Sequence, residues 1–300
     1  MISKYPQYPF KMDLKILEAI IDLQNIEDSV SHTTELENQN QDLREKLDFS
    51  ENQLMRAKEM IEKQKSLISL FVQKEDFGMK LRLACKEGNI KLIEVLLRSG
   101  TNANATRGPH GSTALHSAAN DGHFEASKLL IKYGAKVDAR NEFGWNPLHY
   151  AVRRGDCSVV KLLLQHGADP NALDEKNQTP LHVVAQEDHT DIFEILIQNG
   201  SDVNAKTVDD VLPIHITTWR GRFAESKILL EHGASLNAKS KKGWTPIGMA
   251  AINAHFQVVS LLLDYNADKQ LQCYEKTPLQ WAKLILKTDD YLKIKSLLAA

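Results

Sequence analysis

Histidine and cysteine are the side chains of this 300-residue chain that could bind a transition metal, and it holds eleven histidines and three cysteines. A zinc site needs three or four such ligands close together, and short spacings such as C-x2-C usually mark one. Cys85, Cys157 and Cys273 lie far apart and form no such spacing. We interpret them as free thiols in a reducing compartment, and we expect neither a metal site nor a cofactor.

Most of the histidines belong instead to a repeat. A Leu-His pair, or its equivalent, returns every 32 or 33 residues, and Leu81 lies 34 residues before the first pair. The pairs are Leu115-His116, Leu148-His149, Leu181-His182, Ile214-His215, Ile247-Gly248 and Leu279-Gln280. This period divides residues 74–300 into seven units: 74–107, 108–140, 141–173, 174–206, 207–239, 240–272 and 273–300. A fixed period of this length is typical of a stacked array.

The period and the motif resemble those of the ankyrin repeat. The third unit reads NEFGWNPLHYAVRRGDCSVVKLLLQHGADPNAL and the fourth reads DEKNQTPLHVVAQEDHTDIFEILIQNGSDVNAK. The resemblance implies a mainly α fold, a solenoid of helix-turn-helix units with β-hairpin fingers, in which each unit is stabilised by its neighbours. It also implies that the recurring histidines make hydrogen bonds and packing contacts between units rather than bind a metal.

The local chemistry of each unit predicts the same pair of helices independently. Threonine stands where the first helix needs an N-cap, at Thr113, Thr179, Thr245 and Thr277. Proline follows at the first helical position, at Pro147, Pro180, Pro213, Pro246 and Pro278. Glycine ends the second helix, at Gly100, Gly134, Gly167, Gly200 and Gly233, with Asn266 in the sixth unit. The finger turns hold residues that tolerate positive φ: Gly111, Gly144, Asn177, Asp210 and Gly243.

The fifth unit departs most from this pattern. Leu212 replaces the N-cap threonine, and Thr217 and Thr218 replace the small alanines of the other units. Such a departure within a regular array marks either a functional position or tolerated drift.

Residues 1–73 do not belong to the repeat. Segment 1–30 contains a candidate short helix, and segment 31–73 carries a heptad pattern over 36–71. The a positions are Asn40, Leu47, Leu54, Ile61 and Ile68, and the d positions are Leu36, Leu43, Ser50, Ala57, Gln64 and Phe71. One interpretation is a coiled coil that makes a parallel homodimer. The other is a single long helix that is solvated or folds back onto the first repeat.

Composition excludes several classes of function. The net charge of −2 argues against nucleic acid as the main partner, because phosphate binding needs a basic field. No apolar run reaches the roughly 18 residues of a membrane span or forms an N-terminal signal peptide, so we expect no membrane partner and a cytoplasmic or nuclear location. G-x-S-x-G, HExxH, P-loop and G-x-G-x-x-G motifs are missing, so we do not expect an enzyme.

The resemblance places a binding surface on the concave side, at the finger tips and the exposed ends of the first helices. Tryptophan and arginine are enriched in interface hot spots, and they direct the prediction to a set of nine residues. These are Phe143, Trp145, Arg153, Arg154, Trp219, Arg220, Lys241, Lys242 and Trp244. We expect a partner segment with acidic and apolar side chains. Trp145 and Trp244 have an alternative role, which is to pack between neighbouring hairpins.

The leading hypothesis is therefore a non-catalytic adaptor or scaffold that binds a partner protein. The alternatives are a regulator or inhibitor that blocks a partner's surface, and a substrate-recruiting subunit of a larger enzyme complex. Asn104, Asn171, Asn204 and Asn237 occupy a position at which some ankyrin repeats are hydroxylated. The alternative for these asparagines is that they make turn hydrogen bonds.

Overall fold

The computed structural model describes residues 53–62, 77–106 and 109–299. Residues 53–62 form a helix. The candidate helix in segment 1–30 and the rest of the predicted coiled coil over 36–71 lie outside the described residues. None of the described helices is both long and apolar enough to cross a bilayer.

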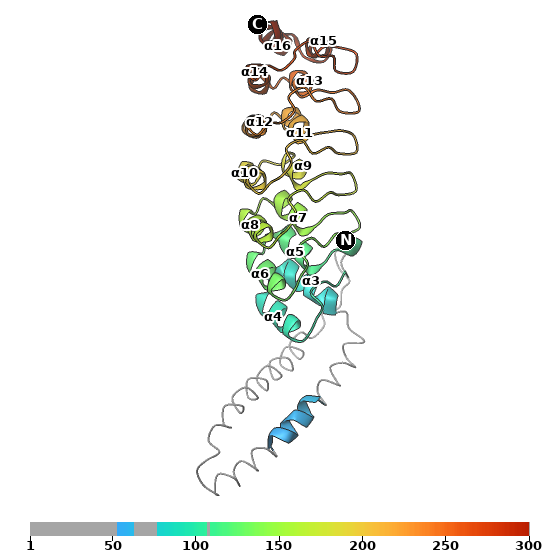
Figure 1. Cartoon of the computed structure of the whole chain (residues 1–300), viewed down its shortest axis with the longest axis vertical. Helices are drawn as coiled ribbons and strands as arrows, with labels where there is room; N and C mark the ends of the chain where they lie inside the picture. The colour runs from blue at the N-terminus through green and yellow to red at the C-terminus, as the bar shows by residue number, and fades with distance from the viewer. Residues whose placement is uncertain (1–52, 63–76, 107–108, 300) are drawn as a thin grey trace.

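From Phe77 to Ala299 the chain forms two parallel rows of helices (Figure 1). The inner row is α3 (Phe77–Glu87), α5 (Ala114–Asp121), α7 (Pro147–Arg154), α9 (Pro180–Val184), α11 (Pro213–Arg220), α13 (Pro246–Ile252) and α15 (Pro278–Ile285). The outer row is α4 (Ile90–Arg98), α6 (Phe124–Lys132), α8 (Cys157–Gln165), α10 (Thr190–Gln198), α12 (Phe223–Glu231), α14 (Phe256–Asp264) and α16 (Thr288–Ala299). Each helix contacts its pair and the next helix of its own row. The fold is therefore the helical solenoid that the sequence predicts.

The loops between successive pairs project as fingers from the side of the inner row opposite the outer row (Figure 1). They follow a hairpin path, but the described residues contain no strand and only one isolated bridge, between Cys273 and Lys276. A finger such as the third closes with a hydrogen bond from the Asn141 N–H to the Trp145 carbonyl (2.9 Å). One such bond is too few to make the continuous ladder of a β-strand pair.

Backbone hydrogen bonds also join the tips of successive fingers. The N–H of Glu142 donates to the carbonyl of His110 at 2.8 Å, and the N–H of Glu175 donates to the carbonyl of Phe143 at 3.1 Å. Val208 to Lys176 and Lys241 to Asp209 continue the series at 3.0 and 2.8 Å. Within the described residues no equivalent bond joins the sixth finger to the seventh. A short 3-10 turn, η2 (Pro109–Gly111), occupies the first of these tips.

The predicted helix boundaries are confirmed by the backbone. Thr113, Thr179, Thr245 and Thr277 are N-cap residues, and Asn146 and Leu212 take that place in the third and fifth units. The glycines that end the outer helices have φ between 82° and 88°. Asn266 has φ of 65°, so it adopts the left-handed conformation that this position requires.

Four histidines join the units to one another from within the core. His116, His149, His182 and His215 are at most 1% exposed. Nε2 of each donates to a carbonyl of the next finger: that of Trp145 (3.0 Å), Gln178 (3.3 Å), Val211 (3.0 Å) and Trp244 (3.2 Å) respectively. Nδ1 of each accepts the backbone N–H of its own N-cap residue, at 3.1 to 3.3 Å. Burial lowers the pKa of His116 and of His149 to about 4, because a charged imidazole loses its hydration there.

The asparagines that recur at one position of the repeat also join neighbouring units, in the loops. The Asn171 amide donates to the carbonyl of Gly200 (2.9 Å) and accepts the N–H of Asp202 (2.7 Å). Asn104 and Asn204 make the same pair of contacts to the unit that follows them, and Asn237 accepts the N–H of Asp268. These are turn hydrogen bonds between units, as the alternative interpretation expects.

Two departures from the repeat pattern have packing explanations. In the fifth unit the Ser226 hydroxyl donates to the Thr217 hydroxyl at 2.9 Å, so a buried polar pair joins α12 to α11 where other units have alanine. In the sixth unit Gly248 replaces the histidine, and a Cβ built on it would lie 2.3 Å from the Cys273 sulfur. Cys273 therefore occupies the space that the imidazole fills elsewhere, and its sulfur lies 2.8 Å from the Thr245 hydroxyl.

The three cysteines are unpaired. Burial raises the pKa of the Cys85 thiol to about 12, so this thiol stays protonated at neutral pH.

Candidate functional site

The surface that the sequence analysis predicts to bind a partner, which we call the concave surface, combines the fingers with three positions of each unit. In α7 these are Tyr150, Arg153 and Arg154, which share one face because residues three and four apart on a helix are neighbours. Tyr150 and Arg153 both contact Trp145 from the finger. This face is therefore turned toward the fingers, and we call its three positions the groove positions of a unit.

Arg153 is held by the solenoid itself. Its guanidinium carbon lies 4.9 Å from the centroid of the Trp145 ring and 5.1 Å from that of Tyr150, both in cation–π geometry. Its Nη2 donates to the Asn120 side-chain oxygen of the preceding unit at 2.9 Å. Much of the charge of Arg153 is therefore already engaged within the concave surface.

Trp145 is half-buried between two units. Its ring stacks on His149 at 5.5 Å between centroids, and its Nε1–H donates to the Asp174 carboxylate at 3.2 Å. This is the packing role that we gave as the alternative for this residue. Trp244 is also half-buried, and its ring lies 5.4 Å from that of Trp281 in the next unit.

The other predicted residues of the third unit are exposed. The Phe143 side chain at the finger tip is 46% exposed and contacts the His110 ring at 4.5 Å. Arg154 is exposed and, within the described part of the chain, has no hydrogen-bond or ion-pair partner.

The predicted residues at the ends of the inner helices form two separate groups. Trp219 is 46% exposed, and Arg220 beside it is exposed without a polar partner among the described residues. Both lie at the end of α11, whereas Arg153 and Arg154 end α7, and α9 lies between these helices (Figure 1). The groove positions between them hold Gln186 and Glu187, so the two groups are not adjacent.

The last predicted group is at the tip of the sixth finger, where Lys241 and Lys242 are exposed. Next to it, in α15, the structure adds groove residues that the sequence analysis missed. Leu284 is 64% exposed and Ile285 is 54% exposed. The step of 32 residues from Ile252 and Asn253 would have identified both positions.

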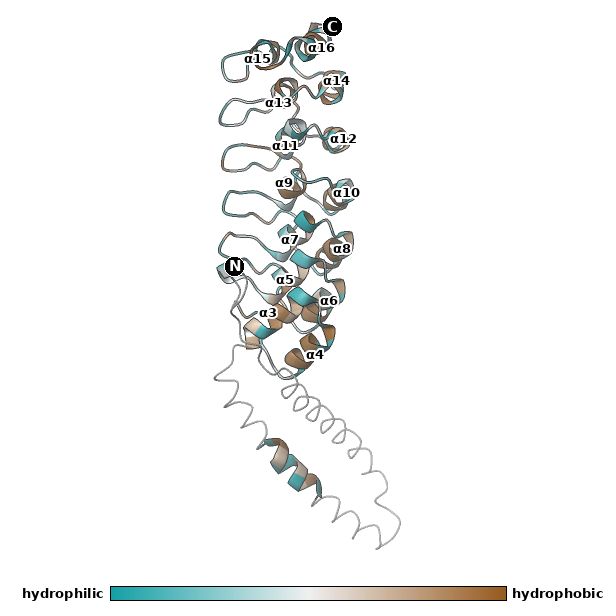
Figure 2. Cartoon of the chain, turned by 180° about the vertical axis from the view of Figure 1, so that it is seen from behind, coloured by the Kyte–Doolittle hydropathy of each residue, from teal (hydrophilic) through white to brown (hydrophobic). Residues whose placement is uncertain are grey.

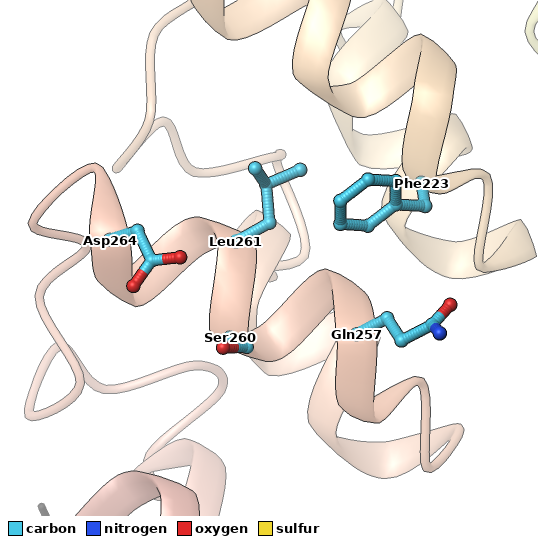
Figure 3. Close-up of a pocket in the computed structure, with 5 residues that line it drawn as sticks. All are labelled: Phe223, Gln257, Ser260, Leu261 and Asp264. Atoms are coloured by element: carbon cyan, nitrogen blue, oxygen red, sulfur yellow. The ribbon is translucent and has the colours of Figure 1, made fainter.

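The outer row carries a shallow pocket of about 330 Å3 between α12 and α14 (Figure 3). Phe223 and Leu261 face one another across it, and Gln257 and Asp264 lie at its opposite ends. Ser260 completes its lining. A single carboxylate and an exposed phenyl ring supply few converging polar groups, so the pocket is a weaker candidate than the concave surface. Elsewhere, no three His, Cys, Asp or Glu side chains of the described residues are placed to hold a metal ion.

Comparison with known proteins gives the relatives of this chain. The family model "Ankyrin repeats (3 copies)" matches residues 81–174, 138–207, 168–240 and 214–285. Notch-regulated ankyrin repeat-containing protein A of Danio rerio is 42% identical over 66 residues, which are 21% of this chain and 59% of that protein. Human protein phosphatase 1 regulatory subunit 27 is 38% identical over 60 residues, 20% of this chain and 39% of that protein. This chain thus spans about three fifths or less of these relatives.

The structure of the human ASB11 ankyrin repeat domain superposes with a TM-score of 0.65 and 26% identity, over 72% of this chain and 96% of that one. The overlapping family matches run from residue 81 to residue 285, well over half of the chain. They cover the histidine contacts, the capped helices and the fingers described above. The chain therefore belongs to the ankyrin repeat family.

Proposed function

We propose that this chain is a non-catalytic protein-binding module whose concave surface binds a partner protein. Ankyrin repeat domains generally mediate protein–protein interaction. The observation that carries the proposal is the pair Trp219 and Arg220: both side chains are exposed, and among the described residues neither has a hydrogen bond, an ion pair or a ring contact. Arg154 and Phe143 add a second exposed group of the residue types that dominate interfaces.

The test compares three full-length baits in a lysate of the source cells. The groove variant carries Arg154→Ala, Trp219→Ala and Arg220→Ala, which leaves the structural residues Arg153 and Trp145 intact. The control variant carries Lys161→Ala, Phe223→Ala and Lys227→Ala, which removes exposed side chains of the same kinds from the outer row. Captured proteins are quantified by mass spectrometry, and circular dichroism shows that each bait is folded.

We expect the wild type and the control to capture a protein that the groove variant loses at least tenfold. Equal capture by all three baits would contradict the proposal, and loss from the control variant alone would direct attention to the outer row.

The adaptor role is part of the proposal, and it requires two proteins to be bound at once. Once a groove partner is known, a sedimentation experiment should find it in one complex with a second captured protein. The regulator alternative is supported by the relative whose name describes a phosphatase regulatory subunit. A regulator would instead displace the second protein from that partner.

We also propose a homodimer through residues 36–71. Leu54 and Ile61 occupy a positions and are less exposed than Met55 and Met60 of the same helix. Leu54→Glu with Ile61→Glu should halve the mass seen in analytical ultracentrifugation, whereas Met55→Glu with Met60→Glu should not change it. A wild type that sediments as a monomer would rule the dimer out.

A further inference from the structure

The chemistry of the groove positions changes halfway along the solenoid. In the second, third and fourth units the positions hold mostly polar or charged residues, such as Asn120, Arg154 and Glu187. In the last three units they are mostly apolar, and we call six of them the apolar strip: Ile216, Trp219, Met249, Trp281, Leu284 and Ile285. The helices that carry the strip are neighbours, because α11 contacts α13 and α13 contacts α15.

The strip is accessible and partly rigid. Leu284, Ile285 and Trp219 are each about half exposed or more, whereas Ile216, Met249 and Trp281 are half-buried; exposed apolar residues grouped on neighbouring helices are typical of interaction sites. The terminal repeat of a solenoid ordinarily has a polar outward surface, since this keeps the array soluble. The Trp281 ring is fixed by its hydrogen bond to the Cys273 carbonyl (2.6 Å), so it loses little freedom on binding.

The charges of the last three units indicate the chemistry of a partner that the strip would bind. The fingers and inner helices of the last three units, 207–220, 240–253 and 273–285, carry five cationic and three anionic side chains, net +2. The equivalent segments 108–121, 141–154 and 174–187 carry three cationic and five anionic side chains, net −2. The cations of these segments are Arg220, Lys241, Lys242, Lys276 and Lys283, and Lys276 Nζ lies 5.1 Å from the centroid of the Trp281 ring. A net positive charge on the elements that carry an apolar surface favours a partner with carboxylates beside apolar side chains.

We propose that the last three units bind an acidic segment of a partner protein that places apolar side chains on the strip. This inference rests on the proposed function and assigns it to one half of the concave surface. Three stacked helices, about 8–10 Å apart, span roughly 16–20 Å. That length is covered by about 11–13 residues of helix or about 5–6 residues of extended chain.

The test uses a displayed library of random 16-residue peptides selected on the full-length chain. We expect the enriched peptides to combine aspartate or glutamate with leucine or aromatic residues. Leu284→Ser with Ile285→Ser should weaken their binding by about tenfold or more, as expected for hot-spot residues. Both side chains are exposed, so the variant should remain folded. The matched control, Leu83→Ser with Phe223→Ser, removes exposed apolar side chains outside the strip and should bind the peptides as the wild type does.

A second variant tests the charge argument. Lys241→Glu, Lys242→Glu and Lys283→Glu should reverse the selection and enrich basic apolar peptides. Three outcomes would each overturn the inference. The wild type could select basic peptides, the peptides could still bind after loss of Leu284 and Ile285, or no peptide could be enriched at all. One outcome would overturn this inference and leave the proposed function intact. In that outcome the variant with Arg154→Ala, Trp219→Ala and Arg220→Ala no longer binds the peptides, whereas the variant with Leu284→Ser and Ile285→Ser still does.

Discussion

Acid should unfold this solenoid through its buried histidines, and His149 offers the sharpest test. Its Nδ1 accepts the Asn146 N–H at 3.3 Å and its Nε2–H donates to the Gln178 carbonyl at 3.3 Å, so the neutral ring satisfies both contacts. A second proton would have to go on Nδ1, which lies 2.7 Å from the Asn146 side-chain oxygen, but the charged ring would lose its hydration because the site has no exposure to water. The fold therefore favours the neutral ring, in agreement with a pKa of about 4.

The direction and size of the effect follow from linkage. In the unfolded chain an imidazole takes up its proton as pH falls through about 6.5, whereas the folded His149 does so only near pH 4. Between these values the unfolded state binds more protons, so stability falls as pH falls. A difference from 6.5 to about 4 corresponds to about 3 kcal/mol per histidine at 1.36 kcal/mol for each pH unit. His116 behaves alike, so the two together approach the total stability of a typical domain, about 5–15 kcal/mol.

The chain itself provides a replacement that does not titrate. Gln280 occupies the equivalent position of the last unit, where its side-chain oxygen accepts the Thr277 N–H at 2.9 Å. We expect His149→Gln to lower the free energy of unfolding by about 1–2 kcal/mol at neutral pH, because the glutamine amide reaches the next unit less well. Between pH 6.5 and 4, the free energy of unfolding of this variant should fall by about 3 kcal/mol less than that of the wild type.

The assay is urea unfolding followed by circular dichroism at a series of pH values. Val160→Ala serves as the control, because it removes buried apolar volume without a titrating group and its curve should run parallel to that of the wild type. If the wild type and His149→Gln also ran parallel, the reasoning about the buried ring would be refuted.

Three further changes test the packing described above, each by urea unfolding. Gly248→Ala should lower the free energy of unfolding by roughly 1–3 kcal/mol, since its Cβ would lie 2.3 Å from the Cys273 sulfur. Adding Cys273→Ala should restore part of this stability. If nothing is restored, the clash is not the cause. Asn171→Ala removes two hydrogen bonds to the next unit and should cost about 1–3 kcal/mol, so an unchanged midpoint would show that water replaces them. Trp145→Ala should lower the free energy of unfolding by about 2 kcal/mol or more, because the ring packs against neighbours in two units. Trp219→Ala should change it by no more than about 0.5 kcal/mol, because Trp219 is exposed. Equal changes would contradict a packing role for Trp145 and a binding role for Trp219.

The sequence alone predicts those elements that are determined by residues close together in the chain. A threonine before a proline starts a helix, and a glycine or Asn266 ends one, so the period alone places each helix pair. The resemblance to the ankyrin repeat also implies that His149 and its equivalents make hydrogen bonds between neighbouring units. The fingers were less predictable, because one closing hydrogen bond such as that from Asn141 to Trp145 gives a hairpin path without a strand.

The candidate site was predicted less completely, because it depends on side chains from neighbouring units. The spacing identifies Arg153 as a groove residue, but it does not reveal that Trp145, Tyr150 and Asn120 hold its guanidinium. The period of 33 residues, in contrast, already places one unit between this group and Trp219, which lies two repeats later. Leu284 was not predicted, although the seventh unit keeps the groove positions of a complete unit.

The hydrogen bonds between finger tips also determine how the solenoid responds to force. A pull along the stack loads these bonds in series, so every junction carries the same tension and the weakest one opens first. The junction between the sixth and seventh fingers is the one that lacks this bond among the described tips. Under tension the last unit should therefore detach before the others, and the apolar strip would be divided at α15 while the histidine contacts between the earlier units stay closed.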